Sequence, residues 1–279
     1  MKRLFLIFTF PAILIAGNID LSLKKNKGQS SYIVSSSNFQ NLKSKLIFPF
    51  NYNSFDFEYG DKLKDFNISI SLSFLLNSKV KKGEDYDWHN SNLTVYSHSN
   101  NKIDKYYSIG IMLNKNIFYN IDFFAKFNYK ILDMYWSNTY QEDYIKNNNE
   151  YIMSNTLKFQ QKFYKYYLGF SYKNNFFKNI SFLLKPSLVF AYVNTKDTHI
   201  LRDFYATQNA KTFGYAINSE LKYRLTMKSN LKISIAYIKI EDKSVNMDYY
   251  NKLNEKYLSY PSSYYYKNSA IGIHYSYNF

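Results

Sequence analysis

Polar and apolar residues alternate with a period of two along most of this chain. In the segment that begins at Phe66, apolar side chains occupy the even positions up to Phe74, and serine or asparagine occupies the odd positions between them. Similar runs cover 107–113, 180–192, 213–223 and 271–279. Because successive side chains on a strand point to opposite faces, this pattern predicts β-strands with one apolar face and one polar face.

Two kinds of connection separate these strands. Short polar connections lie near 62–65, 115–120, 173–178 and 227–230, and long ones near 35–42, 78–105, 137–155, 194–204 and 243–267. Alternating short and long turns, combined with an outward apolar face, are typical of transmembrane β-barrels, which usually have an even number of strands. We therefore predict one all-β domain: a ten-stranded antiparallel transmembrane β-barrel with short periplasmic turns and five long extracellular loops.

The first residues predict export. Met1-Lys2-Arg3 is basic, and the stretch from Leu4 to Ala16 is almost entirely apolar. This stretch is shorter than the roughly 20 residues of a spanning helix, and it matches a secretory signal peptide. We expect residues 1–16 to be the signal peptide, with cleavage after Ala16 or Gly17, and residues 17–279 to form the barrel. The last residue, Phe279, follows alternate aromatic residues, which resembles the C-terminal signal of bacterial outer-membrane proteins.

Composition narrows the class further. Aromatic residues make up 20% of the chain, yet its mean hydropathy is −0.43. A secreted β-sandwich would also show alternation, but the serine, asparagine and glycine of the polar face fit a wet lumen better. The net charge of +15 comes mainly from lysines spread evenly along the chain, which favours an anionic lipid surface over nucleic acid. The chain has no cysteine, which excludes disulfides, thiolate metal sites and cysteine nucleophiles.

Two motifs in the long connections carry candidate chemistry. The first is Glu84-Asp85-Tyr86-Asp87-Trp88, and the second is Asp197-Thr198-His199. Residues i and i+2 of an extended segment share a face. Asp85 and Asp87 would then crowd two carboxylates together, which raises the pKa of one of them. Asp197 would orient the His199 imidazole, which could take a proton from a water held between the two motifs.

A simpler interpretation is that these are solvated loop residues, because loops are rich in acids and histidines. Asp-x-His is common, whereas Asp-x-Asp-Trp is rare by chance. We interpret His89, His98 and His274 as ordinary polar residues. A metal site built from His89, His98 and the nearby acids has suitable ligand types, but the spacing defines no coordination geometry.

Asp85-x-Asp87-Trp88 followed two long connections later by Asp197-x-His199 resembles the omptins, ten-stranded outer-membrane proteases of Gram-negative bacteria. The resemblance covers nearly the whole mature chain. It implies an endopeptidase with its site facing outside, in which His199 is the general base, Asp197 orients it, and Asp85 and Asp87 position the attacking water. It implies polypeptide substrates, outer-membrane lipid as surroundings, and no metal or organic cofactor, although lipopolysaccharide could be required. We expect a monomer that does not bind nucleic acid.

The sequence departs from the omptin pattern at two places. Omptins cleave beside Arg or Lys because acids line the substrate pocket. In this chain the position two residues before Asp197 is Thr195, and residues 28–32 of the first predicted strand contain no acid. Glu84 or Asp203 could replace them from neighbouring connections. Omptins also bind lipid A through basic residues near the rim, where Lys162 matches but the partnering position is Asp133. We therefore expect a weaker preference for basic substrates and a weaker or displaced lipid site.

Two other functions fit a barrel of this kind. A non-enzymatic barrel, either an adhesin or a narrow porin, would leave the four residues without a catalytic role. A lipid-modifying barrel hydrolase would need its catalytic Ser or His on the lipid-facing side, whereas His274 has inward parity.

Overall fold

The computed structural model describes residues 17–36 and 41–279, so the predicted signal peptide lies outside the described residues. The described chain consists almost entirely of antiparallel strands. Their bounds are β1 Asn18–Ser36, β2 Leu42–Leu63, β3 Phe66–Lys79, β4 Lys81–His89, β5 Asn92–Phe118, β6 Ile121–Asp143, β7 Asn148–Phe177, β8 Ile180–His199, β9 Phe204–Arg224, β10 Ser229–Asn251 and β11 Lys256–Asn278. Within the described ranges, no helix is long and apolar enough to cross a membrane.

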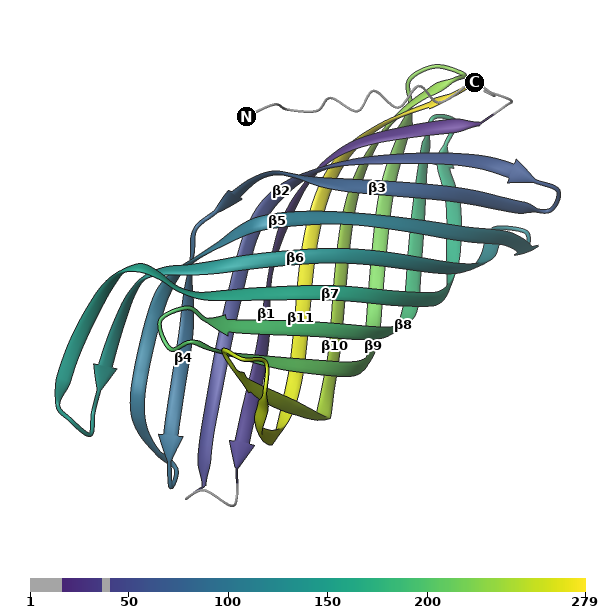
Figure 1. Ribbon diagram of the computed structural model, residues 1–279. Coiled ribbons are helices and arrows are strands. Elements are labelled where there is room, and N and C mark those ends of the chain that lie inside the picture. The colour runs from purple at the N-terminus through teal and green to yellow at the C-terminus, as the bar shows by residue number, and fades with distance from the viewer. Residues whose placement is uncertain (1–16, 37–40) are drawn as a thin grey trace.

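The strands close into a ring (Figure 1), because β1 pairs with β2 on one side and with β11 on the other. Only Val80 separates β3 from β4, and both lie between β2 and β5. They occupy one position in the ring, so eleven segments build ten barrel positions. The predicted ten-stranded antiparallel barrel is confirmed. Closing the ring satisfies the backbone groups that an open edge would leave unpaired.

Short and long hairpins lie at opposite ends of the barrel. The short turns are 64–65, 119–120, 178–179 and 225–228. Most of each later long connection, from 78–105 onward, is itself strand, because these hairpins continue and end in tight turns such as Asn90 and Ser91, whose φ angles are 48° and 66°. The candidate residues, which we expected in loops, therefore lie on β4 and at the end of β8.

The two faces of each strand differ as the alternation predicts. On β11, Ile271 and Ile273 are about 60% exposed on the outer face (58% and 61%), whereas His274 and Ser276 are buried inside. The same outward exposure of large apolar side chains continues around the ring, for example at Phe74, Ile111, Leu168, Phe190, Ile217 and Ile233. A continuous apolar outer surface of this kind is what a bilayer requires of a spanning barrel.

A plug of aromatic side chains fills the lumen below the long hairpins. It consists of Tyr32, Phe48, Trp136 and Phe159, all at most 3% exposed. Phe48 of β2 and Phe159 of β7 stack across the lumen with ring centroids 4.1 Å apart, and Trp136 lies 4.9 Å from Phe48. The barrel is therefore closed by packed side chains at this level, and the plug forms the floor beneath the candidate motifs.

We expect Phe48→Ala to destabilise the barrel by about 3–5 kcal/mol, because it leaves a cavity among well-packed rings. The measurement is the urea midpoint of unfolding in lipid vesicles. Phe74→Ala is the matched control, since this phenylalanine is 49% exposed on the outer face. Equal losses for both variants would contradict a structural role for the plug.

Candidate active site

Asp85 and Asp87 point into the barrel mouth from β4. They lie opposite Leu46 and Ser44 of β2, and the Ser44 hydroxyl hydrogen-bonds to both carboxylates. Burial raises the pKa of Asp85 well above its usual value, and the charges of Asp87 and Asp197 raise it further. Burial also raises the pKa of Asp87. This strand thus presents a crowded acid pair, as its i, i+2 spacing predicts.

Asp197 and His199 share the inner face at the end of β8. Asp197 is completely buried, and its Oδ2 lies 3.7 Å from Nε2 of His199. The imidazole stacks on Phe204 of β9, with ring centroids 4.2 Å apart. A buried carboxylate on one side and an aromatic face on the other hold the ring in one orientation, which a general base requires.

Tyr32 is a third partner of this pair that the sequence did not reveal. Its hydroxyl donates a hydrogen bond to Oδ2 of Asp197 across the lumen, from β1 to β8. Burial and the negative charge of Asp197 raise the pKa of Tyr32 well above its usual value, so the phenol remains a donor. The alternation along the strand indicates that the Tyr32 side chain points inward. It does not indicate that its partner is Asp197, 165 positions away along the chain.

One residue of each motif opens onto the same small cavity. Asp85 and His199 both line this space of about 80 Å³. A water molecule occupies about 30 Å³ in the liquid, so the space accepts water between the two motifs. Arg202, on the turn after β8, lines the same cavity and lowers the pKa of both carboxyls by its charge. Its role was also missed, although arginine is rare in this chain.

Other polar residues of the motifs point away from this cavity. Glu84 accepts a hydrogen bond from Tyr96 and lies opposite His98 in the β4–β5 pairing. Asp203 is exposed and pairs with Lys252 at 3.4 Å. Neither acid therefore replaces the missing pocket acids. Within the described ranges, no group of three or more His, Cys, Asp or Glu side chains could hold a metal ion.

Thr195 lies one inward position below Asp197 on β8. It is 4% exposed, and its Oγ1 is buried without a hydrogen-bond partner. Its neighbours across the strands are Gln161 of β7 and Gln208 of β9, both of which are also buried. The layer beneath the dyad is therefore polar and uncharged where the omptin pattern has an acid.

Lys162 lies on β7 with its side chain exposed on the outer face, opposite Ile131 of β6 and Asn194 of β8. Asp133 of β6 is buried and accepts a hydrogen bond from Gln160 at 3.1 Å. The two residues are thus not in register, and Asp133 offers no second positive charge beside Lys162.

The solved structure of an outer-membrane protease, OmpT from Escherichia coli, has the same fold. It superposes with a TM-score of 0.82, covering 95% of this chain and 97% of that chain, at 13% sequence identity. The outer-membrane protein OprG from Pseudomonas aeruginosa (TM-score 0.41, 8% identity, covering 95% and 96%) and the translocator domain of the autotransporter NalP from Neisseria meningitidis (0.39, 8%, covering 95% and 89%) are too distant to support an argument. No family model and no curated protein sequence matches the chain.

Proposed function

We propose that this protein is an outer-membrane endopeptidase of the omptin type. The observation that carries the proposal is the single cavity at the barrel mouth, onto which Asp85 of one motif and His199 of the other both open. The two motifs are more than a hundred positions apart in the sequence, and the fold brings them to opposite walls of one space. The likeness of the fold to a solved outer-membrane protease supports the same function.

The proposed reaction uses the two motifs in different roles. His199, oriented by Asp197, takes a proton from a water in the cavity, and the hydroxide attacks the peptide carbonyl carbon. The crowded pair Asp85 and Asp87 shares a proton because both carboxyls have a raised pKa. The ionised member orients the water, and the protonated member donates a hydrogen bond to the oxyanion. His199 then returns its proton to the leaving amine, so no metal or cofactor takes part in the scheme.

The surroundings of the site follow from the same proposal. We propose that the barrel lies in the outer membrane of a Gram-negative bacterium, with the long hairpins and the site outside; its apolar outer face supports a membrane location. The exposed ammonium of Lys162 can pair with a phosphate of lipopolysaccharide, so we propose a dependence on this lipid. We also propose that the protein acts as a monomer.

The test is cleavage of an unselected peptide library by the refolded barrel, with and without lipopolysaccharide, analysed by mass spectrometry. Cleavage that disappears in His199→Ala supports the proposal. A folded barrel that cleaves nothing under either condition would instead favour an adhesin or a narrow porin.

The same library tests the substrate pocket. We expect the wild type to prefer Arg and Lys less than omptins do, because a basic side chain entering the lumen sheds its water without meeting a carboxylate at Thr195. Thr195→Asp should increase the selection for Arg and Lys by about two to three decades, since a buried charge partner contributes about 2–5 kcal/mol. The matched control is Thr198→Asp, which adds the same charge on the opposite face of β8. A wild-type profile already dominated by basic residues, and unchanged in Thr195→Asp, would place the pocket elsewhere.

A further inference from the structure

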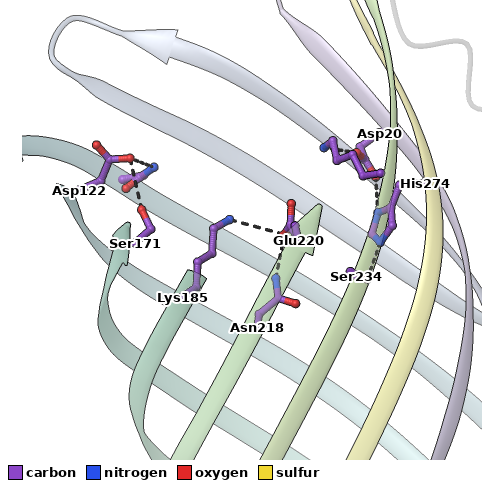
Figure 2. Close-up of polar contacts among 10 residues, drawn as sticks. Asp20, Asp122, Ser171, Lys185, Asn218, Glu220, Ser234 and His274 are labelled. Atoms are coloured by element: carbon purple, nitrogen blue, oxygen red, sulfur yellow. Dashed lines mark hydrogen bonds and ion pairs between the residues drawn. The ribbon is translucent and has the colours of Figure 1, made fainter. Parts of the chain in front are cut away.

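A second cluster of reactive side chains lies inside the barrel, toward the end with the short turns. It consists of Asp20 of β1, His274 of β11 and Ser234 of β10, which are three neighbouring strands (Figure 2). Nδ1 of His274 lies 2.9 Å from Oδ1 of Asp20, and Nε2 lies 2.7 Å from Oγ of Ser234. All three residues are at most 8% exposed, so the contacts form inside the lumen.

These contacts have the connectivity of a nucleophile, a base and an orienting carboxylate. In such an arrangement the carboxylate holds Nδ1–H, which leaves Nε2 free to accept the hydroxyl proton of the serine. Lys232 contacts the other oxygen of Asp20, Oδ2, at 2.5 Å, so one oxygen remains for His274. We infer that Ser234 is the nucleophile of a second hydrolytic site, which takes a small, negatively charged ester in the barrel lumen.

Gly272 packs tightly against the serine and the imidazole. It lies between Ser234 and Lys24 in the strand pairing. A Cβ built on Gly272 would lie 2.9 Å from Oγ of Ser234, 3.0 Å from Nε2 of His274 and 2.9 Å from the side chain of Lys24. A side chain at this position would therefore collide with Ser234, His274 and Lys24, and glycine lets these three residues pack together.

The cavity beside this cluster is small, and its lining carries four lysines and three acids, Asp20, Glu58 and Glu220. Its volume is about 280 Å³, and its lining includes Ser234, His274 and four lysines, namely Lys24, Lys126, Lys185 and Lys232. Lys24 pairs with Asp56 at 2.7 Å, and Lys185 contacts Glu220 at 3.9 Å (Figure 2). Lys126 has no carboxylate within 4 Å among the residues that the structure describes. Its ammonium is thus available to an anionic substrate group.

A path leads to this cavity from the end of the barrel. A second space, of about 380 Å³, shares Asn18, Glu58 and Met112 with the first and extends to Lys62 and Asn278 at the short-turn end. The aromatic plug separates both spaces from the mouth. Substrate would therefore enter from the side opposite to the peptide site, and the two sites would work independently.

The reaction balances without a cofactor. Oγ of Ser234 bonds to the ester carbonyl carbon while its proton passes to Nε2 of His274. The bond to the alcohol oxygen breaks, and the alcohol leaves with that proton. A water then attacks the acyl group on Ser234, giving its proton to His274, which returns it to the serine as the carboxylic acid departs. Lysine ammonium groups facing the cavity stabilise the negative charge that develops on the carbonyl oxygen.

The experiment uses the full barrel refolded in detergent, with His199→Ala as the host so that the peptide site does not contribute. A fluorophosphonate probe should form an adduct on Ser234, because the serine displaces fluoride from phosphorus. The adduct should be absent in Ser234→Ala and strongly reduced in His274→Gln. Ser22→Ala is the matched control, because Ser22 is also buried and lies opposite His274 on β1, whereas the imidazole hydrogen-bonds to Ser234 and Asp20. The folded state of each variant is checked by its heat-modifiable mobility on a gel.

Ester turnover provides the second readout. The barrel should hydrolyse the anionic 4-nitrophenyl succinate monoester faster than neutral 4-nitrophenyl acetate, and Lys126→Gln should reduce that difference. Loss of the base in His274→Gln should lower turnover by about 10²–10⁴-fold. A folded barrel without an adduct on Ser234, or an adduct without ester turnover, would overturn the inference. So would turnover that is unchanged in Ser234→Ala.

Discussion

We expect the replacement of His199 with alanine to lower the rate of the proposed peptide cleavage by about 10²–10⁴-fold, the usual contribution of a general base. The imidazole lies 3.7 Å from Asp197, which is itself held by Tyr32. Without the imidazole, neither of these groups can take the proton of the attacking water, because the carboxylate is buried behind it. The barrel keeps its fold, since His199 lies at the end of β8 and contributes little to the lumen packing.

The measurement is kcat/KM on a peptide that the library identifies, together with the heat-modifiable mobility of the folded barrel. His98→Ala is the matched control, because His98 lies on the neighbouring wall but contacts Tyr96 and Tyr140 instead of the cavity. We expect its kcat/KM to stay within about twofold of the wild type. Cleavage by His199→Ala at the wild-type rate would refute the proposed protease mechanism.

We expect the replacement of Asp85 with asparagine to stabilise the barrel at neutral pH and at the same time to remove most of the proposed peptidase activity. Burial and the neighbouring carboxylates raise the pKa of Asp85 in the folded state, and its Oδ1 is buried without a hydrogen-bond partner. A raised folded pKa means that folding favours the protonated form. The wild type therefore loses stability as the pH rises through that pKa, whereas asparagine stays neutral throughout.

The expected gain in the free energy of unfolding at neutral pH is about 1.4 kcal/mol for each unit by which folding raises the pKa of Asp85. Below the ordinary aspartate value of 3.8, both variants are neutral and the gain should vanish. Urea midpoints measured from pH 3 to pH 8 test this. Asp203→Asn is the control, because this turn residue is exposed and pairs with Lys252. A loss of stability in Asp85→Asn at neutral pH would show that the site stabilises the charged form.

The strand pattern was sufficient to predict the barrel because a strand has a strict period of two. A shift of one residue would place every lipid-facing side chain in the lumen, so the alternation also fixes the orientation of each strand. The same rule predicted that Asp85 and Asp87 share a face, and that Asp197 and His199 do. It could not predict that the strand is interrupted at Val80 and forms two segments, β3 and β4. This interruption depends on how each segment pairs with β2 and β5.

The sequence by itself determined the strand number, the inward and outward faces, and which residues of each motif stand together, because these features depend on neighbours two positions apart. Only the tertiary structure decided what those inward residues meet across the lumen. Tyr32 contacts Asp197, and His274 contacts Asp20, at separations of 165 and 254 positions. Such contacts depend on the closure of the ring and on the height of each strand within it. No local pattern encodes that relative height, since it arises from the register of all the pairs between the two residues.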